Sequence, residues 1–251
     1  MADHRPSDSG PIPPGSSANS AKHEPAPVSE PEPILPAVLL GQTVVTGLVD
    51  SVSFLALGHV FTANMTGNIV FLAFASAGAP GLSIPRSALA LLAFLAGAVA
   101  GGRLAARMSS GSRRRWIGTA LSAETALLVA SAGASIGTGE GSSDTSQYAV
   151  IVLTALGMGV RNATVRRLGV PDLTTTVLTL TLAGVAADSS LAGGSNPRWR
   201  IRIASVACMF LGAVFGALLL RSSLAAPLVA SAILSAGCTA TAFRRLRGSP
   251  G

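Results

Sequence analysis

Eight mostly apolar stretches follow one another along the chain and are separated by short polar or basic segments. A helix needs ~20 predominantly apolar residues to cross a bilayer, with ~17 as the practical minimum. The second and sixth stretches are the doubtful ones, because each is short and opens with polar residues. The stretches cover residues 34–58, 62–78, 87–105, 117–136, 146–162, 170–187, 201–220 and 226–243. The pattern predicts an all-α integral membrane protein.

The composition supports a membrane location. Hydrophobic residues make up 49% of the 251 residues and charged residues only 12%, whereas soluble domains carry about a quarter charged residues. The apolar residues are mainly Ala, Gly, Val and Leu, which suits helices that approach closely in lipid. Residues 1–33 are instead rich in Pro, Ser and acidic residues. We expect a disordered tail there, followed by a single membrane domain at 34–247.

Two short strings recur in the same order in the two halves of the membrane domain. Their order predicts an internal duplication, with similar halves at about 34–136 and 146–243. The first pair is displaced by 112 residues and joins Gly47-Leu-Val-Asp50 to Gly159-Val-Arg-Asn162. The second pair is displaced by 115 residues and consists of Gly97-xxx-Gly101 and Gly212-xxx-Gly216. The paired glycines also predict close helix packing, within the fold or between subunits.

The formal net charge is +7, and almost all the basic residues are arginines. They cluster between apolar stretches, where the positive-inside rule expects them, so we expect a lipid bilayer and no nucleic acid as partner. If all eight stretches crossed, the arginines after 87–105 and those at the C-terminus would lie on opposite faces. If 62–78 and 170–187 do not fully cross, both clusters lie on the cytoplasmic side. The arginines expected to set topology are Arg103, Arg107, Arg113, Arg114, Arg115, Arg244, Arg245 and Arg247.

The charge pattern therefore predicts about six crossings in a bacterial inner membrane, with both termini cytoplasmic; seven or eight full spans is the alternative. Three crossings in each half would insert the second half upside down, which gives the 3+3 inverted repeat common in secondary transporters. The two short polar segments would then be broken or re-entrant helices. Lipid tolerates these only where protein or water surrounds the exposed backbone.

Two carboxylates lie inside apolar stretches, Asp50 in the first and Glu124 in the fourth. An ionisable residue at membrane depth costs at least ~2.5 kcal/mol on insertion scales, so it normally faces a cavity or a charged partner. Each is a candidate ion or proton site. The alternative is that each pairs locally with a polar or basic residue of another helix.

Polar residues at the start of the doubtful segments form the second group of candidates. Amides and hydroxyls beside a glycine allow side chains and backbone to converge on a small polar solute or an ion. The structural alternative is that they satisfy backbone groups freed by the break in the helix. The candidates are Asn64, Thr66, Gly67 and Asn68 in the first half, and Asn162, Thr175 and Thr176 in the second.

With these residues identified, the chain resembles the YoaK-like family of small bacterial integral membrane proteins. The stretches that carry the resemblance are Thr46–Leu55, Val60–Asn68 and Asn162–Thr176. The resemblance implies a membrane protein of about six spans whose substrate and activity are not established. One departure is Arg161, which stands where relatives more often have Gln.

These features favour a transporter or permease for a small polar solute or ion. A non-transporting scaffold or regulatory partner is the alternative. We do not expect an enzyme, a cofactor or a metal, because the sequence offers no Ser-His-Asp set, metal-ligand cluster, phosphate loop or nucleotide fingerprint. Only His59, beside the polar string of the second stretch, leaves an enzyme open.

Overall fold

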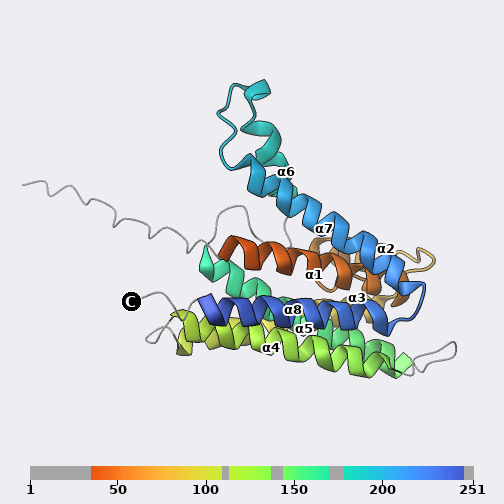
Figure 1. The fold of residues 1–251 in the computed structure, drawn as a ribbon. Helices are drawn as coiled ribbons and strands as arrows, with labels where there is room; N and C mark the ends of the chain where they lie inside the picture. The colour runs from red at the N-terminus through yellow and green to blue at the C-terminus, as the bar shows by residue number, and fades with distance from the viewer. Residues whose placement is uncertain (1–34, 109–112, 137–143, 170–177, 246–251) are drawn as a thin grey trace, which may run out of the picture. The chain divides into compact units, whose positions relative to one another are not determined.

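The computed structural model describes residues 35–108, 113–136, 144–169 and 178–245, all within the compact unit Pro31–Gly251. Every regular element in these ranges is helical (Figure 1). The α-helices are α1 (Leu35–Ala56), α2 (Met65–Ser76), α3 (Ile84–Arg107), α4 (Arg113–Ser135), α5 (Asp144–Leu168), α6 (Leu178–Ala187), α7 (Trp199–Leu220) and α8 (Ala225–Arg245). A short 3-10 helix, η1 (Ser190–Ala192), follows α6.

Six of the described helices are long and apolar enough to cross a membrane, namely α1, α3, α4, α5, α7 and α8. At ~1.5 Å per residue, the 12 residues of α2 rise only about 18 Å. This is well short of the ~30 Å hydrocarbon core, and the ten described residues of α6 are shorter still. The prediction of six crossing helices and two short apolar ones is thus confirmed. Residues 170–177 of the sixth predicted stretch lie outside the described residues.

The helices of the two halves pack in a reciprocal pattern. Helix α1 packs along α7 and α8, whereas α5 packs along α3 and α4. Helix α8 also lies against α4, so it contacts both α1 and α4 (Figure 1). The short helix α2 packs on α3, and α6 packs on α7. Exchanging α1 to α4 for α5 to α8 maps this set of contacts onto itself.

Burial follows the same pairing of helices. In α1 and α5, 72% and 61% of the apolar window is buried, and in α4 and α8 the shares are 44% and 39%. In α3 and α7 they fall to 28% and 17%. Helices α1 and α5 therefore form the centre of the bundle, and α3 and α7 present most of their surface to lipid. Between α1, α4, α5 and α8 lies an apolar cluster that includes Val45, Leu128, Met158 and Ala232.

The predicted packing glycines, together with Gly47 and Gly159, lie at close contacts between the halves. A Cβ atom at Gly47 of α1 would overlap the backbone of α7 at Met209 and Gly212. A Cβ atom at Gly159 of α5 would overlap the backbone of α3 at the corresponding positions, Phe94 and Gly97. Gly47 and Gly159 are 112 residues apart, and the residues that they contact on α7 and α3 are 115 residues apart. The two displacements found in the sequence therefore also relate the two contacts. Gly101 lies against the backbone of Val160 in α5, whereas Gly216 lies against the side chain of Ser51 and the Cα of Leu48 in α1.

The predicted topology arginines lie at helix ends. Arg103 and Arg107 end α3, Arg113 to Arg115 begin α4, and Arg244 and Arg245 end α8. All are exposed except the half-buried Arg114. Arg247 lies outside the described residues.

Candidate functional site

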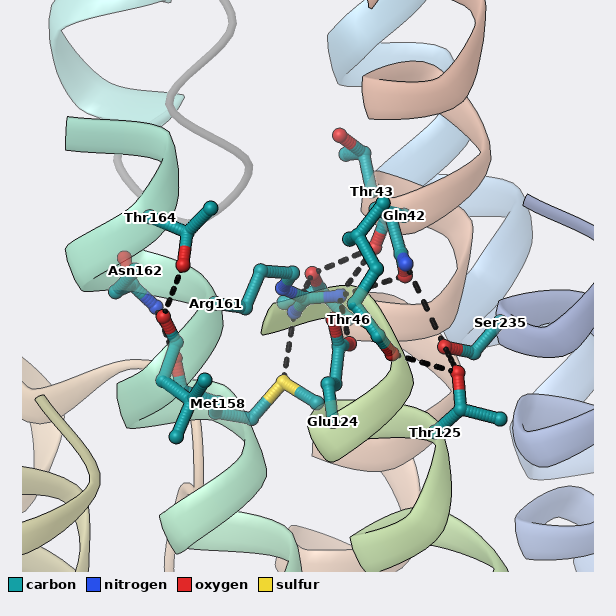
Figure 2. Close-up of polar contacts among 12 residues, drawn as sticks. Gln42, Thr43, Thr46, Glu124, Thr125, Met158, Arg161, Asn162, Thr164 and Ser235 are labelled. Atoms are coloured by element: carbon teal, nitrogen blue, oxygen red, sulfur yellow. Dashed lines mark hydrogen bonds and ion pairs between the residues drawn. The ribbon is translucent and has the colours of Figure 1, made fainter. Parts of the chain in front are cut away.

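Arg161 is buried at the centre of the bundle, although it is a charged residue inside the membrane-spanning helix α5. Its side chain is fully buried and reaches from α5 to α1 (Figure 2). Nη1 donates to the carbonyl oxygen of Gln42 at 2.8 Å and lies 3.3 Å from its Oε1, while Nη2 donates to Oγ1 of Thr46 at 2.6 Å. Nη2 also contacts the sulfur of Met158, one turn earlier in α5. Two helices of different halves therefore share one guanidinium group.

Glu124 of α4 is the charged partner of this arginine. Its Oε1 lies 3.1 Å from Nη1 of Arg161, and both side chains are completely buried. The contact lacks hydrogen-bond geometry, and both carboxylate oxygens have no hydrogen-bond donor among the described residues. Glu124 thus faces inward and is paired through charge, while its oxygens can still accept a proton.

Hydroxyl groups extend the cluster into α8. Nε2 of Gln42 donates to Ser235 at 3.4 Å, and Ser235 lies 2.8 Å from the hydroxyl of Thr125 (Figure 2). Thr125 in turn lies 3.2 Å from the hydroxyl of Thr239. The polar cluster therefore connects α1, α4, α5 and α8, the four helices with the most buried apolar windows.

Asp50 has a different position from the one expected of a solute ligand. Its Oδ1 accepts the backbone N–H groups of Thr62 and Ala63 at 3.2 and 3.0 Å. These residues precede α2, so Asp50 fastens the irregular segment between α1 and α2 to the end of α1. Its Oδ2 is buried without a hydrogen-bond donor among the described residues. Arg161 acts electrostatically on both Asp50 and Glu124.

Asn68 also stabilises this segment instead of facing a cavity. Its Oδ1 accepts the N–H of Phe61 at 2.8 Å, and its Nδ2 donates to the carbonyl of the same residue. One buried amide thus replaces both backbone hydrogen bonds that Phe61 would make in a helix. Phe61 stacks on Phe54 and Phe71, which closes the segment on its apolar side. Asn68 thus satisfies backbone groups that the break in the helix leaves free, which is the structural alternative to a solute ligand.

A cavity of about 410 Å³ lies where α2, α3, α5, α6 and α7 meet. The polar side chains in its lining are those of Asn64, Thr66, Asn162 and Thr179. The described lining residues are Ala63, Asn64, Met65, Thr66, Gly67, Phe94, Asn162, Leu178, Thr179 and Met209. The structure thus brings together four of the predicted site residues, Asn64, Thr66, Gly67 and Asn162. Thr175 and Thr176 lie outside the described residues.

The two halves contribute matching positions to this cavity. Phe94 of α3 and Met209 of α7 both line it and are separated by 115 residues. Asn64, which precedes α2, and Thr179, at the start of α6, line it from the two short helices. The cavity therefore lies on the seam between the two halves.

Sequence reasoning did not identify Arg161, Phe94 or Met209 as site residues. Phe94 and Met209 look like ordinary lipid-facing residues in a linear pattern. Arg161 gave a usable signal, because an arginine inside a predicted spanning helix needs an acidic partner. The sequence offered Asp50 and Glu124, but not which helix would bring either one near it.

Fold and site together define a multi-pass α-helical membrane protein with a charged cluster buried at its centre and a polar cavity where α2, α3, α5, α6 and α7 meet. The chain belongs to the family described as proteins of unknown function (DUF1275), whose model matches residues 38–241. It is 32% identical over 144 residues to the UPF0700 transmembrane protein YoaK of Bacillus subtilis (strain 168). That alignment covers 57% of this chain and 62% of the relative, so it spans less than two thirds of the relative's length. The resemblance to the YoaK-like family is thus confirmed. No solved structure matches the chain.

Proposed function

We propose that this protein is a transporter that moves a small polar solute across the membrane through the cavity at the seam of its halves. The observation that carries the proposal is the lining of that cavity by both halves, with Phe94 of α3 and Met209 of α7 at matching positions. Secondary transporters built from repeats bind their substrate at such a seam, near discontinuous helices. Here the starts of the two short helices α2 and α6 supply part of the lining.

The geometry suits alternating access. Each half exchanges helices with the other, since α1 packs along α7 and α5 along α3. At these crossings glycines bring the helix backbones close together, so few side chains interlock there and would have to repack if one half moved on the other. We propose that this movement opens the cavity alternately to the two sides of the membrane.

The lining favours a neutral polar solute. The described lining residues carry amide and hydroxyl groups and no charged side chain. Amides and hydroxyls both donate and accept hydrogen bonds, and they can replace the hydration shell of a polar molecule. The volume of about 410 Å³ lies toward the lower end of the usual range for ligand pockets, ~300–1,000 Å³, which fits a small solute.

Flux into proteoliposomes tests the proposal. Reconstituted protein is screened with a panel of radiolabelled small solutes, and uptake above empty vesicles is expected for at least one neutral polar member. Thr66→Phe fills the cavity and should abolish that uptake. Ile69→Phe is the matched control on the same helix, because Ile69 is 58% exposed and does not line the cavity. Uptake at background for the whole panel would favour the alternative, a non-transporting membrane protein.

We also propose that both termini lie in the cytoplasm of a bacterial cell. If α2 and α6 do not cross, the basic ends of α3, α4 and α8 share one side, which the positive-inside rule makes cytoplasmic. Reporter fusions after α8 should be active only as cytoplasmic reporters. A periplasmic C-terminus would contradict this orientation.

A further inference from the structure

The buried cluster at the centre of the bundle has unequal numbers of positive and negative groups. Glu124 interacts electrostatically with groups on two helices packed against α4. These groups are Arg161 of α5 and the thiol of Cys238 of α8. Arg161 also acts on Asp50 of α1. All three charged side chains are at most 5% exposed. When both carboxylates are ionised, the described cluster has two negative charges and one positive charge.

An unbalanced charge in this environment is strongly unfavourable. Desolvating an ion is costly even after the protein relaxes around it, and a close opposite charge is needed to offset that cost. Arg161 is bonded to Gln42 and Thr46 of α1 and paired with Glu124, so it cannot fully neutralise Asp50 as well. The remaining oxygens, Oδ2 of Asp50 and Oε2 of Glu124, have no donor among the described residues. The cluster therefore requires one further positive charge.

We propose that Glu124 binds a proton that is exchanged during transport, so that this protein is a proton-coupled transporter. A metal cation such as Na⁺ requires several oxygen ligands, and the described residues contain no group of three or more His, Cys, Asp or Glu side chains that could hold one. Glu124 is the better proton site of the two carboxylates, because Oδ1 of Asp50 accepts two backbone N–H groups whereas neither oxygen of Glu124 has a donor among the described residues. A proton needs only one carboxylate oxygen, and it forms the neutral carboxylic acid without further ligands. The net charge of the cluster then falls from −1 to zero.

The coupling part of this inference rests on the proposed function, and the structure offers a physical route for it. Asn162, adjacent to Arg161 in α5, lines the cavity, as does Ala63, whose N–H donates to Asp50. Protonation of Glu124 removes its attraction for Arg161 and leaves the guanidinium to act on Asp50 alone. Asp50 then holds the N–H groups of Thr62 and Ala63 less strongly. The start of α2, on the wall of the cavity, thus responds to the proton.

Infrared spectroscopy of the full-length protein in lipid detects the proton directly. A protonated carboxyl has a C=O stretching band that a carboxylate lacks, and this band shifts when the carboxyl carbon is ¹³C. We expect one such band at neutral pH from a buried group. It should shift in protein labelled with ¹³C-carboxyl glutamate and stay unchanged in protein labelled at aspartate. The band should be absent from Glu124→Gln.

Three further variants keep the inference testable if Glu124→Gln does not fold. Asp50→Asn leaves a neutral Arg161–Glu124 pair, so the band should disappear at a pH at least ~1 unit lower than in the wild type. Arg161→Gln removes the positive charge of the described cluster, so the band should persist to a pH at least ~1 unit higher. Asp144→Asn is the control, because Asp144 is exposed at the start of α5, and it should leave the band unchanged.

Two results would overturn the inference. One is a band that shifts with aspartate labelling, which would put the proton on Asp50. The other is no buried carboxyl band at any pH at which the protein is folded. Neither result depends on a transported solute, so the failure of the spectroscopic test and the failure of the flux test are distinguishable.

Discussion

Replacement of Gly97 by alanine should loosen the contact between α3 and α5. A Cβ atom at this position would overlap the carbonyl oxygen of Leu156 and lie 2.9 Å from both its carbonyl carbon and its Cα. Carbon atoms in contact are normally about 3.5–4.0 Å apart, so the two helices must separate by roughly 0.6–1 Å. The obstacle is backbone, and it cannot rotate away as a side chain would. Overpacking of this kind costs about 1–3 kcal/mol.

Gly102→Ala is the matched control, because it lies five residues later on the same helix and its Cβ would meet nothing within 4 Å. Both substitutions gain the helix propensity of alanine, about 0.5–1 kcal/mol. The difference between the two variants therefore isolates the overlap with α5. We expect Gly97→Ala to be about 1–3 kcal/mol less stable than Gly102→Ala.

Equilibrium unfolding in mixed micelles of mild detergent and sodium dodecyl sulfate, followed by tryptophan fluorescence, measures this difference. Gly212→Ala, at the corresponding crossing of α7 with α1, should show a loss similar to that of Gly97→Ala. If Gly97→Ala and Gly102→Ala unfold at the same detergent composition, the close approach of the two helices does not exist in the protein. The reasoning on the glycine seam would then be refuted.

Three other substitutions test the buried polar groups and the surface. Arg161→Gln leaves Asp50 buried without a positive partner and should cost about 3–5 kcal/mol, with partial recovery in the double variant with Asp50→Asn; equal stability of the single variant and the wild type in the same micelle assay would contradict this. Asn68→Ala frees both backbone groups of Phe61 and should raise amide hydrogen exchange at 60–68, whereas unchanged exchange would refute the bridging role. Asp144→Asn removes the ion pair between Arg86 and the exposed Asp144. The unfolding free energy should change by less than about 1 kcal/mol, and a larger change would contradict this.

Local sequence determined where the crossing helices lie and how closely they pack. Apolar runs must form helices in lipid, because no water is available to satisfy the backbone there. The strings around Gly97 and Gly212 predicted close contacts, and both glycines pack against the backbone of a helix from the other half. These features depend on residues near one another in the chain or on simple periodicity, so they can be recognised without a partner.

Only the tertiary structure decided which polar residues act together. Asp50 and Asn68 resembled ligands in the sequence, but hydrogen bonds to Thr62, Ala63 and Phe61 give them a structural task. Glu124 looked isolated, and its partner Arg161 lies on the next helix. A charged residue in a spanning helix needs a partner nearby in space. Which residue becomes that partner depends on how the helices rotate and cross, and the spacing of residues along the chain does not specify this. The same limit applies to the cavity. Phe94 and Met209 both line it because helices of one half pack against helices of the other, and the sequence alone does not show that packing.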